Sequence, residues 1–170
     1  MTKYRAYAAV TLDGKIAKHT RHFSDWTSKE DKNLFQKNLA KADLVIAGMN
    51  TYKTAKKPLS KRNCIVLTRS VKKTKQEKPN ILFCNPKGRH PKEIIKENGY
   101  KNIAIIGGSE IYSFVLKERM MDELCLTIEP VIFGEGIPLF SEEVRRRAFE
   151  LKSVKKLNAR GTLYLVYRVK

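Results

Sequence analysis

Short apolar runs alternate with amphipathic segments along most of the chain. Apolar runs that end at glycine or at charged residues are typical of buried strands, whereas apolar positions three and four residues apart predict helices with one buried face. Strands are predicted at residues 5–12, 42–48, 63–67, 80–84, 102–106 and 122–128, and helices at 49–54, 91–97 and 109–116, with a further helix capped by Thr27 or Ser28 that runs to about residue 40. Residues 68–78 predict a basic loop, and residues 150–155 and 162–169 predict a closing antiparallel pair.

The order of these elements predicts the fold class. Strands that alternate with helices favour a mainly parallel sheet, and strands with no helix between them favour an antiparallel edge. The 170 residues suit one domain with a sizeable core, and the sequence shows no internal repeat, linker or composition break. We therefore expect a single α/β domain over residues 1–170.

Charge is the most unusual feature of the composition. The chain has 35 lysines and arginines against 17 acidic residues, a net charge of +18. Such an excess suits a nucleic-acid-binding protein, a binder of an anionic cofactor, or a solvated basic surface. The basic residues are dense only at residues 71–78 and 145–147, where no aromatic residue is interleaved with them. This pattern disfavours sequence-specific nucleic-acid binding.

Cysteine usage and hydropathy predict a cytoplasmic protein without a membrane segment. Cys64, Cys84 and Cys125 lie in strand-like apolar runs, as expected for core thiols in a reducing compartment. The sequence has no CxxC motif and no Cys/His cluster, so no metal site is expected, and His19 and His22 in a polar segment are expected to be solvated. No apolar run approaches the roughly 20 residues of a membrane span, and the N-terminus lacks a signal-peptide pattern.

The segment of residues 103–112, Ile-Ala-Ile-Ile-Gly-Gly-Ser-Glu-Ile-Tyr, carries the first chemical signal. It predicts a buried strand, a tight turn at Gly107 and Gly108, and the start of a helix. Glycine lets another backbone or a ligand approach closely, and the N–H groups that begin the next helix suit a phosphate. A simple turn explains the same residues, so the interpretation depends on the rest of the chain.

Four blocks in a fixed order resemble the dihydrofolate reductase superfamily, which includes dihydrofolate reductase and the reductase domain of riboflavin biosynthesis. They are residues 8–17, residues 25–35 with Trp26, Asp31 and Phe35 at the family spacings, residues 42–52 continued by 57–70, and residues 103–112. The resemblance covers nearly the whole chain. It implies a three-layer sandwich in which a mainly parallel twisted sheet of about eight strands has an antiparallel C-terminal edge and helices on both faces.

The resemblance implies a substrate site centred on a carboxylate. A pterin presents a 2-amino group beside N3–H, and one carboxylate accepts both hydrogen bonds. The residues implied in catalysis are Asp31, Trp26 and Thr127, and those implied in substrate binding are Ala9, Asp31, Phe35, Arg62 and Thr127, with Arg62 on the glutamate tail of a folate. Three alternatives stay open: Asp31 as a helix-start acid, Glu30 in its place, and Arg62 as part of a basic turn.

NADPH is the cofactor that the resemblance implies. The implied cofactor-binding residues are Ala9, Ile16, Gly48, Met49, Asn50, Thr51, Thr68, Arg69, Ser70, Ile106, Gly107, Gly108, Ser109, Glu110, Ile111 and Tyr112. Many dihydrofolate reductases have an arginine directly after the glycine that Gly48 matches, and it contacts the 2′-phosphate of NADPH. Met49 stands there in this chain, and Arg69 is expected to supply that contact.

The expected reaction is hydride transfer from NADPH to a C=N bond of a pterin, with reduction of dihydrofolate to tetrahydrofolate as the first expectation. The alternative is the riboflavin-pathway 5-amino-6-(5-phosphoribosylamino)uracil reductase, which residues 12–15 and 134–140 favour. A basic nucleic-acid-binding protein is a remote alternative. The partner is expected to be a small-molecule substrate, and the protein a monomer or homodimer.

Overall fold

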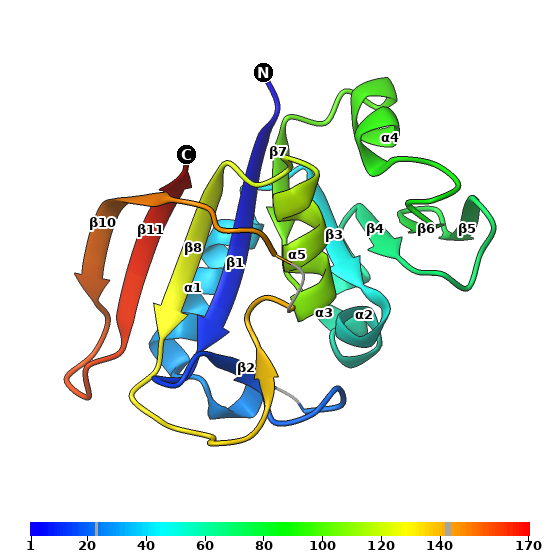
Figure 1. The fold of residues 1–170 in the computed structure, drawn as a ribbon. Coiled ribbons are helices and arrows are strands. Elements are labelled where there is room, and N and C mark those ends of the chain that lie inside the picture. Colours follow the sequence, from blue (N-terminus) through cyan, green and yellow to red (C-terminus); the bar gives the residue numbers. More distant parts are fainter. Residues whose placement is uncertain (23, 142–143) are drawn as a thin grey trace.

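One large sheet organises the fold (Figure 1). Among the residues that the computed structural model describes (1–22, 24–141 and 144–170), nine strands form it in the order β10–β11–β8–β1–β7–β3–β4–β6–β5. Their bounds are β1 (Lys3–Val10), β3 (Leu44–Gly48), β4 (Cys64–Leu67), β5 (Thr74–Lys78), β6 (Ile81–Cys84), β7 (Asn102–Ile105), β8 (Glu123–Ile128), β10 (Phe149–Lys156) and β11 (Leu163–Val169). A separate small sheet pairs β2 (Lys15–Ala17) with β9 (Ile137–Pro138).

The sheet is parallel in its centre and antiparallel at both ends. Strands β8, β1, β7, β3, β4 and β6 run parallel, whereas β11 and β10 close one end and β5 the other. The expected α/β class with an antiparallel C-terminal edge is therefore confirmed. The strand count exceeds the expected eight because residues 74–78, expected in a basic loop, form β5. Most side chains of β5 are exposed, so no apolar alternation marks this strand in the sequence.

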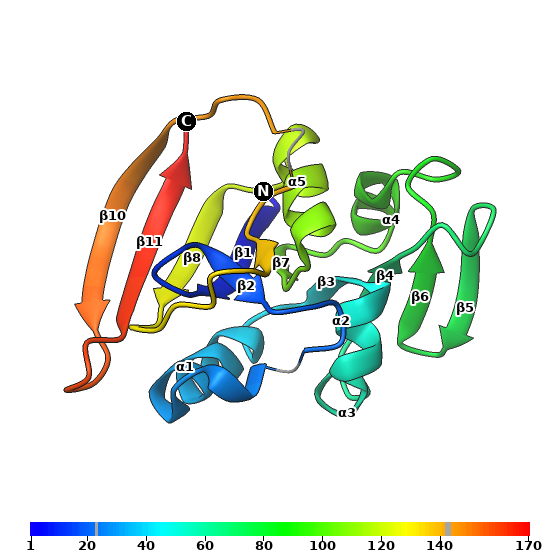
Figure 2. The ribbon, with the colours of Figure 1, turned by 60° about the horizontal axis from the view of Figure 1, so that its bottom comes forward.

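Helices cover both faces of the sheet, which confirms the three layers (Figure 2). One face carries α1 (Lys29–Leu39), α2 (Met49–Thr54) and α3 (Lys56–Leu59), and the other carries α4 (Pro91–Glu97) and α5 (Ser109–Lys117). Crossovers between parallel strands are right-handed. The β1-to-β3 and β7-to-β8 connections progress in opposite directions across the sheet, so α1 and α5 lie on opposite faces.

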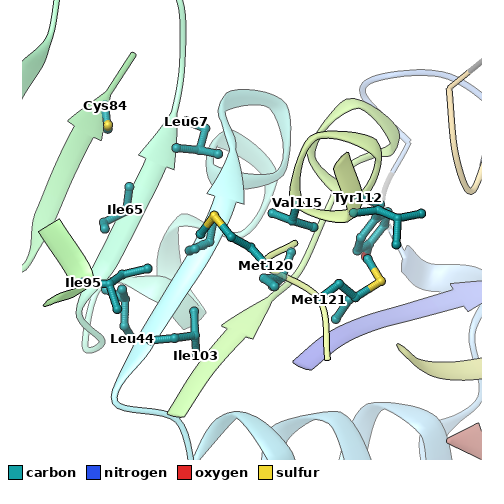
Figure 3. Packing of buried hydrophobic residues seen from close by; sticks show 14 of the residues in the cluster. Leu44, Ile65, Leu67, Cys84, Ile95, Ile103, Tyr112, Val115, Met120 and Met121 are labelled. Carbon is teal, nitrogen blue, oxygen red and sulfur yellow. The ribbon is translucent and has the colours of Figure 1, made fainter. Parts of the chain in front are cut away.

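Alternate residues of β3 pack into opposite layers of the core. Leu44 and Ile46 belong to the cluster beneath α4 and α5, whereas Val45 and Ala47 belong to the cluster beneath α1, α2 and α3. Figure 3 shows the first cluster, with Leu44, Ile65, Leu67, Cys84, Ile95, Ile103, Tyr112, Val115, Met120 and Met121 labelled. Because both faces of β3 are buried, its sequence is a continuous apolar run.

The connections leave a crevice at the carboxyl ends of the central strands. Strand β7 lies between β1 and β3, and the chain leaves β1 and β7 toward opposite faces of the sheet. A reversal of this kind places a binding crevice at the strand ends. Gly48 ends β3 and residues 106–108 follow β7, so both glycine segments of the sequence meet at this crevice.

Candidate active site

A cavity of about 1290 Å³ lies at the carboxyl ends of the parallel strands. The lining includes these residues that the sequence implied: Ala9, Ile16, Trp26, Asp31, Phe35, Gly48, Met49, Asn50, Thr51, Thr68, Arg69, Ile106, Gly108, Ser109, Glu110, Ile111, Tyr112 and Thr127. Gly107, Ser70 and Arg62 are not in the lining. The structure thus brings most of the expected cofactor and substrate residues to one cavity.

Two glycines let the ends of β3 and β7 touch. The Gly48 N–H donates to the Gly107 carbonyl oxygen at 2.8 Å. A Cβ on Gly48 would lie 2.9 Å from Ile111 Cγ1, and a Cβ on Gly107, whose φ is +93°, would lie 2.8 Å from the Tyr112 hydroxyl oxygen. The Gly107–Gly108 peptide is cis. A side chain at either position would therefore force the side chain of Ile111 or Tyr112 in α5 to shift.

The starts of α2 and α5 both face the cavity with free backbone donors. Their N-cap residues, Gly48 and Gly108, provide no side-chain hydrogen bond. The Ser109 hydroxyl oxygen is buried and, within the described part of the chain, has no hydrogen-bond partner. Unpaired N–H groups and a positive dipole end suit a phosphate, and a buried unpaired hydroxyl suits a bound polar group.

The loop after β4 forms one side of the cavity. Thr68 Oγ1 lies 3.0 Å from Ser70 Oγ and accepts from the Ser70 N–H at 3.1 Å. The Arg69 guanidinium lies 4.0 Å from the Glu110 carboxylate, and both side chains are mostly exposed. Arg69 is therefore a solvated cation, available to an anionic group bound in the cavity.

Tyr112 is a structural member of the lining. Its hydroxyl is buried and donates to the Tyr7 carbonyl oxygen at 2.5 Å, which joins α5 to β1. Burial raises the pKa of Tyr112 far above its ordinary value of 10. The phenol therefore stays neutral and serves as a fixed donor.

Asp31 lies in the first turn of α1 and turns its carboxyl into the cavity. Ser28 caps the helix, since its hydroxyl accepts from the Asp31 N–H at 3.2 Å. The Thr127 hydroxyl of β8 donates directly to Asp31 Oδ1 at 2.5 Å. The sheet thereby orients one carboxyl oxygen, and the carboxyl lines the cavity.

Burial raises the pKa of Asp31 above its ordinary value, and the charge of Glu129 adds to this effect. Hydrogen bonds from Thr127 and Thr27 and the charge of Lys32 act in the opposite direction. Because the pKa rises on balance, the protein favours the protonated form of this carboxyl more than water does.

Aromatic and histidine side chains complete the substrate side of the cavity. Phe35 packs edge-on against Tyr7 with ring centroids 6.2 Å apart, and Trp26 packs against Phe133 at 5.0 Å. His19 and His22, expected to be solvated, line the cavity. Their loop folds back because the Lys18 N–H donates to His22 Nδ1 at 3.0 Å, a contact that no sequence motif indicates.

Arg62 and Glu30 lie outside the cavity lining. Arg62 Nη1 donates to the Leu39 carbonyl oxygen at 3.0 Å, at the end of α1, and the side chain does not line the cavity. Glu30 is exposed, accepts from Asn158 Nδ2 at 3.3 Å, and also lies outside the lining. Of the two neighbouring carboxyls, only that of Asp31 reaches the cavity.

Glu129, which the sequence analysis did not single out, is a second acid at this site. It follows β8 two residues after Thr127 and is only 4% exposed. Its Oε1 accepts from the Ser28 N–H at 2.7 Å and its Oε2 from the Thr162 hydroxyl at 2.7 Å. Its position in the sequence could have indicated this role. Alternate residues of a strand share a face, so an acid two residues after Thr127 lies on the same side of the sheet as Thr127.

Two further features concern metal-binding groups and membrane-spanning helices. Within the described ranges, no group of three or more histidine, cysteine, aspartate or glutamate side chains could hold a metal ion. No helix in the same ranges has the length and apolar character needed to cross a membrane.

The steric role of Gly107 gives a first prediction. Gly107→Ala should destabilise the protein by more than Gly99→Ala, because both positions have positive φ but only Gly107 has no room for a Cβ. The positive φ alone costs roughly 1 kcal/mol. Chemical denaturation measures both free energies of unfolding, and equal losses in the two variants would contradict the collision with Tyr112.

The raised pKa of Asp31 gives a second prediction. A carboxyl whose pKa is raised by folding lowers the free energy of unfolding as the pH rises from its unfolded pKa of about 4 through its folded pKa. Asp31→Asn keeps an oxygen for Thr127 and removes this titration. Urea denaturation from about pH 3 to 7 measures the free energy of unfolding of the variant and of the wild type. As the pH rises, the value for the variant should increase relative to that for the wild type. A difference that does not change with pH would contradict the raised pKa of Asp31.

Comparison with known proteins places the chain among relatives of similar length. "Uncharacterized protein YwjB" of Bacillus subtilis is 33% identical over 168 residues, which cover 94% of this chain and 95% of the relative. A pyrimidine reductase-like protein from Corynebacterium diphtheriae has a similar fold, with a TM-score of 0.81, 15% identity, and coverage of 99% of this chain and 92% of that chain.

A larger protein also contains this fold. The diaminohydroxyphosphoribosylaminopyrimidine deaminase/5-amino-6-(5-phosphoribosylamino)uracil reductase of Thermotoga maritima gives a TM-score of 0.75 at 19% identity. The match covers 99% of this chain and 57% of that protein. The family model described as dihydrofolate reductase matches residues 5–161. With this match and the crevice geometry, the chain belongs to the dihydrofolate reductase family.

Proposed function

We propose that this protein is an NADPH-dependent reductase that adds a hydride to a C=N bond of a substrate that carries a pyrimidine ring, while water supplies the proton that the nitrogen gains. In a phosphoribosylaminouracil this bond is the imine that forms when the ribosyl ring opens, and in dihydrofolate it lies in the pterin ring. The observation that carries the proposal is one cavity with two complementary ends. At one end, the glycine contact between β3 and β7 exposes two helix starts; at the other, Thr127 orients the carboxyl of Asp31. Family membership favours a reductase over the basic nucleic-acid binder.

The residues around the glycine contact fit a dinucleotide phosphate. Backbone N–H groups at the starts of α2 and α5 and the buried hydroxyl of Ser109 would hold the diphosphate. Thr68 and Arg69 would hold the 2′-phosphate, since a guanidinium forms forked hydrogen bonds with phosphate oxygens. Bound NADPH supplies the hydride, so the remaining task of the protein is to align the acceptor.

The substrate side of the cavity is suited to hold and shield a flat heterocycle. Asp31 binds the polar edge of the ring, and Thr127 fixes the orientation of that carboxyl. Phe35 supplies an apolar surface for the ring face, and Trp26 and the loop before it exclude water from the reacting atoms.

Two substrates fit this chemistry, and the comparisons reverse the order expected from the sequence. The phosphoribosylaminouracil is the first candidate, because proteins named for pyrimidine reduction share the fold and because Lys32, His19 and His22 line the cavity as partners for its phosphate. Dihydrofolate is the second, favoured by Asp31 and Phe35. Arg62, the cation expected for its glutamate tail, donates to the Leu39 carbonyl oxygen and does not line the cavity.

Parallel assays test the reaction and the role of Asp31. When the purified protein is mixed with NADPH and a substrate, the absorbance of reduced nicotinamide should fall faster with the phosphoribosylaminouracil than with dihydrofolate. Asp31→Ala should lower turnover by about 10²-fold through loss of substrate alignment, while NADPH binding is retained. The matched control Glu30→Ala removes the neighbouring exposed carboxylate and should leave turnover near wild type. Wild-type turnover in Asp31→Ala, or no turnover with either substrate, would contradict the proposal.

The preference for NADPH is tested at Arg69. Losing one charge-assisted contact to the 2′-phosphate costs about 1.5–3 kcal/mol, so Arg69→Ala should raise the KM for NADPH about ten- to hundredfold and leave the KM for NADH unchanged. Lys72→Ala removes an exposed charge from the same loop, outside the cavity lining, and should change neither value. An equal rise in the KM for NADPH and in the KM for NADH in Arg69→Ala would contradict a contact between Arg69 and the 2′-phosphate.

A further inference from the structure

A buried acid stands behind the substrate-facing carboxyl. Glu129 does not line the cavity, yet it is nearly inaccessible to solvent and its charge acts on Asp31. The two acids share Ser28, whose N–H donates to Glu129 while its hydroxyl accepts from the Asp31 N–H. Glu129 is therefore held against the start of the helix that carries Asp31.

The hydrogen bonds identify Glu129 as a carboxylate. Both of its oxygens accept, one from the Ser28 N–H and one from the Thr162 hydroxyl, each at 2.7 Å. The Thr162 hydroxyl in turn accepts from Asn158 Nδ2 at 2.9 Å, so its own proton points to Glu129. Both oxygens accept and no described residue accepts from Glu129, a pattern that matches the charged form of the group.

The surroundings of Asp31 have opposing effects on its pKa, and the effects that raise it are the larger. Burial and the Glu129 charge favour its neutral form, whereas Lys32 and the hydrogen bonds from Thr127 and Thr27 favour its charged form. The balance favours the neutral form relative to water. A ligand that covers the cavity removes further water from Asp31 and moves the balance in the same direction.

The protonation state of Asp31 determines which heterocycle edge it matches. A carboxylate offers two acceptors, which match the N3–H and 2-amino group of a 2-aminopyrimidinone. A carboxylic acid offers one donor and one acceptor, which match a ring carbonyl beside N3–H in a pyrimidinedione. Thr127 donates to Oδ1, which leaves Oδ2 to carry the proton in the acid form.

Resting on the proposed function, we propose that Glu129 is a positioning residue that keeps Asp31 in its carboxylic-acid form when substrate binds, and so selects a pyrimidinedione edge over a 2-aminopyrimidinone edge. The two edges differ only at C2 of the ring, and the selection requires no contact between Glu129 and the ligand. This inference identifies the substrate class of the site.

A matched pair of ligands tests the selection. The probes are 5-amino-6-ribitylaminouracil 5′-phosphate and its 2-amino analogue, titrated by calorimetry into the protein saturated with NADP⁺. The number of protons taken up is obtained from titrations in buffers of different ionisation enthalpy. At a pH above the pKa of Asp31, the 2-oxo ligand should bind with uptake of about one proton, and the 2-amino ligand with none. In that pH range, the affinity for the 2-oxo ligand should fall about tenfold per pH unit relative to the 2-amino ligand.

Three variants separate the electrostatic role from a structural one. An amide offers one donor and one acceptor, so Asp31→Asn should keep the 2-oxo ligand and lose the 2-amino ligand. Glu129→Gln should shift the affinity ratio measurably toward the 2-amino ligand, because removal of the Glu129 charge lowers the pKa of Asp31. The control Glu30→Gln, an exposed acid beside Asp31, should leave the ratio unchanged.

The outcomes distinguish this inference from the proposed function. Loss of both ligands in Asp31→Asn, absence of proton uptake with the 2-oxo ligand, failure of the 2-oxo ligand to bind, or an unchanged affinity ratio in a folded Glu129→Gln would overturn the inference. Binding with the predicted proton uptake but no NADPH oxidation would support it and contradict only the proposed reaction. If Glu129→Gln does not fold, Glu129→Ala takes its place in the measurement of the affinity ratio, while the wild-type proton uptake and Asp31→Asn test the acid form of Asp31.

Discussion

The contact between Gly48 and Gly107 is the constraint on which the site depends. The Gly48 N–H reaches the Gly107 carbonyl at 2.8 Å and so joins the ends of β3 and β7. A side chain at either position would collide with Ile111 or Tyr112 of α5. Because both side chains are absent, α2 and α5 begin next to each other and expose their first N–H groups to the same cavity.

Asp31 shows how one residue serves both the fold and the site. The sequence left open whether it is a helix-start acid or a substrate-binding carboxyl, and the structure is compatible with both. Its backbone N–H completes the cap at Ser28, while its carboxyl accepts from Thr127 across the cavity. The sheet therefore orients the carboxyl, and the buried charge of Glu129 biases its proton.

Sequence patterns predicted the elements whose burial is regular and missed those that depend on distant packing. Strand β3 was predictable because both of its faces are buried, and the glycines mark the ends of β3 and β7. Edge strand β5 has almost no buried face and hence no pattern. The resemblance to the family indicated the sequence position of Arg62 but not the contact of its side chain, whose guanidinium donates to a carbonyl oxygen at the end of α1. Glu129 resembles a loop acid in sequence, and its burial arises from packing against Ser28 and Thr162.

The proposed binding of NADPH in this cavity can be measured with a fluorophore that the chain already contains. Trp26 is the single tryptophan and lines the cavity. Titration of the protein with NADPH, followed by tryptophan fluorescence, should give saturable quenching with one cofactor per chain and with energy transfer to the reduced nicotinamide. Quenching that rises without saturation, or no change up to millimolar NADPH, would contradict the account.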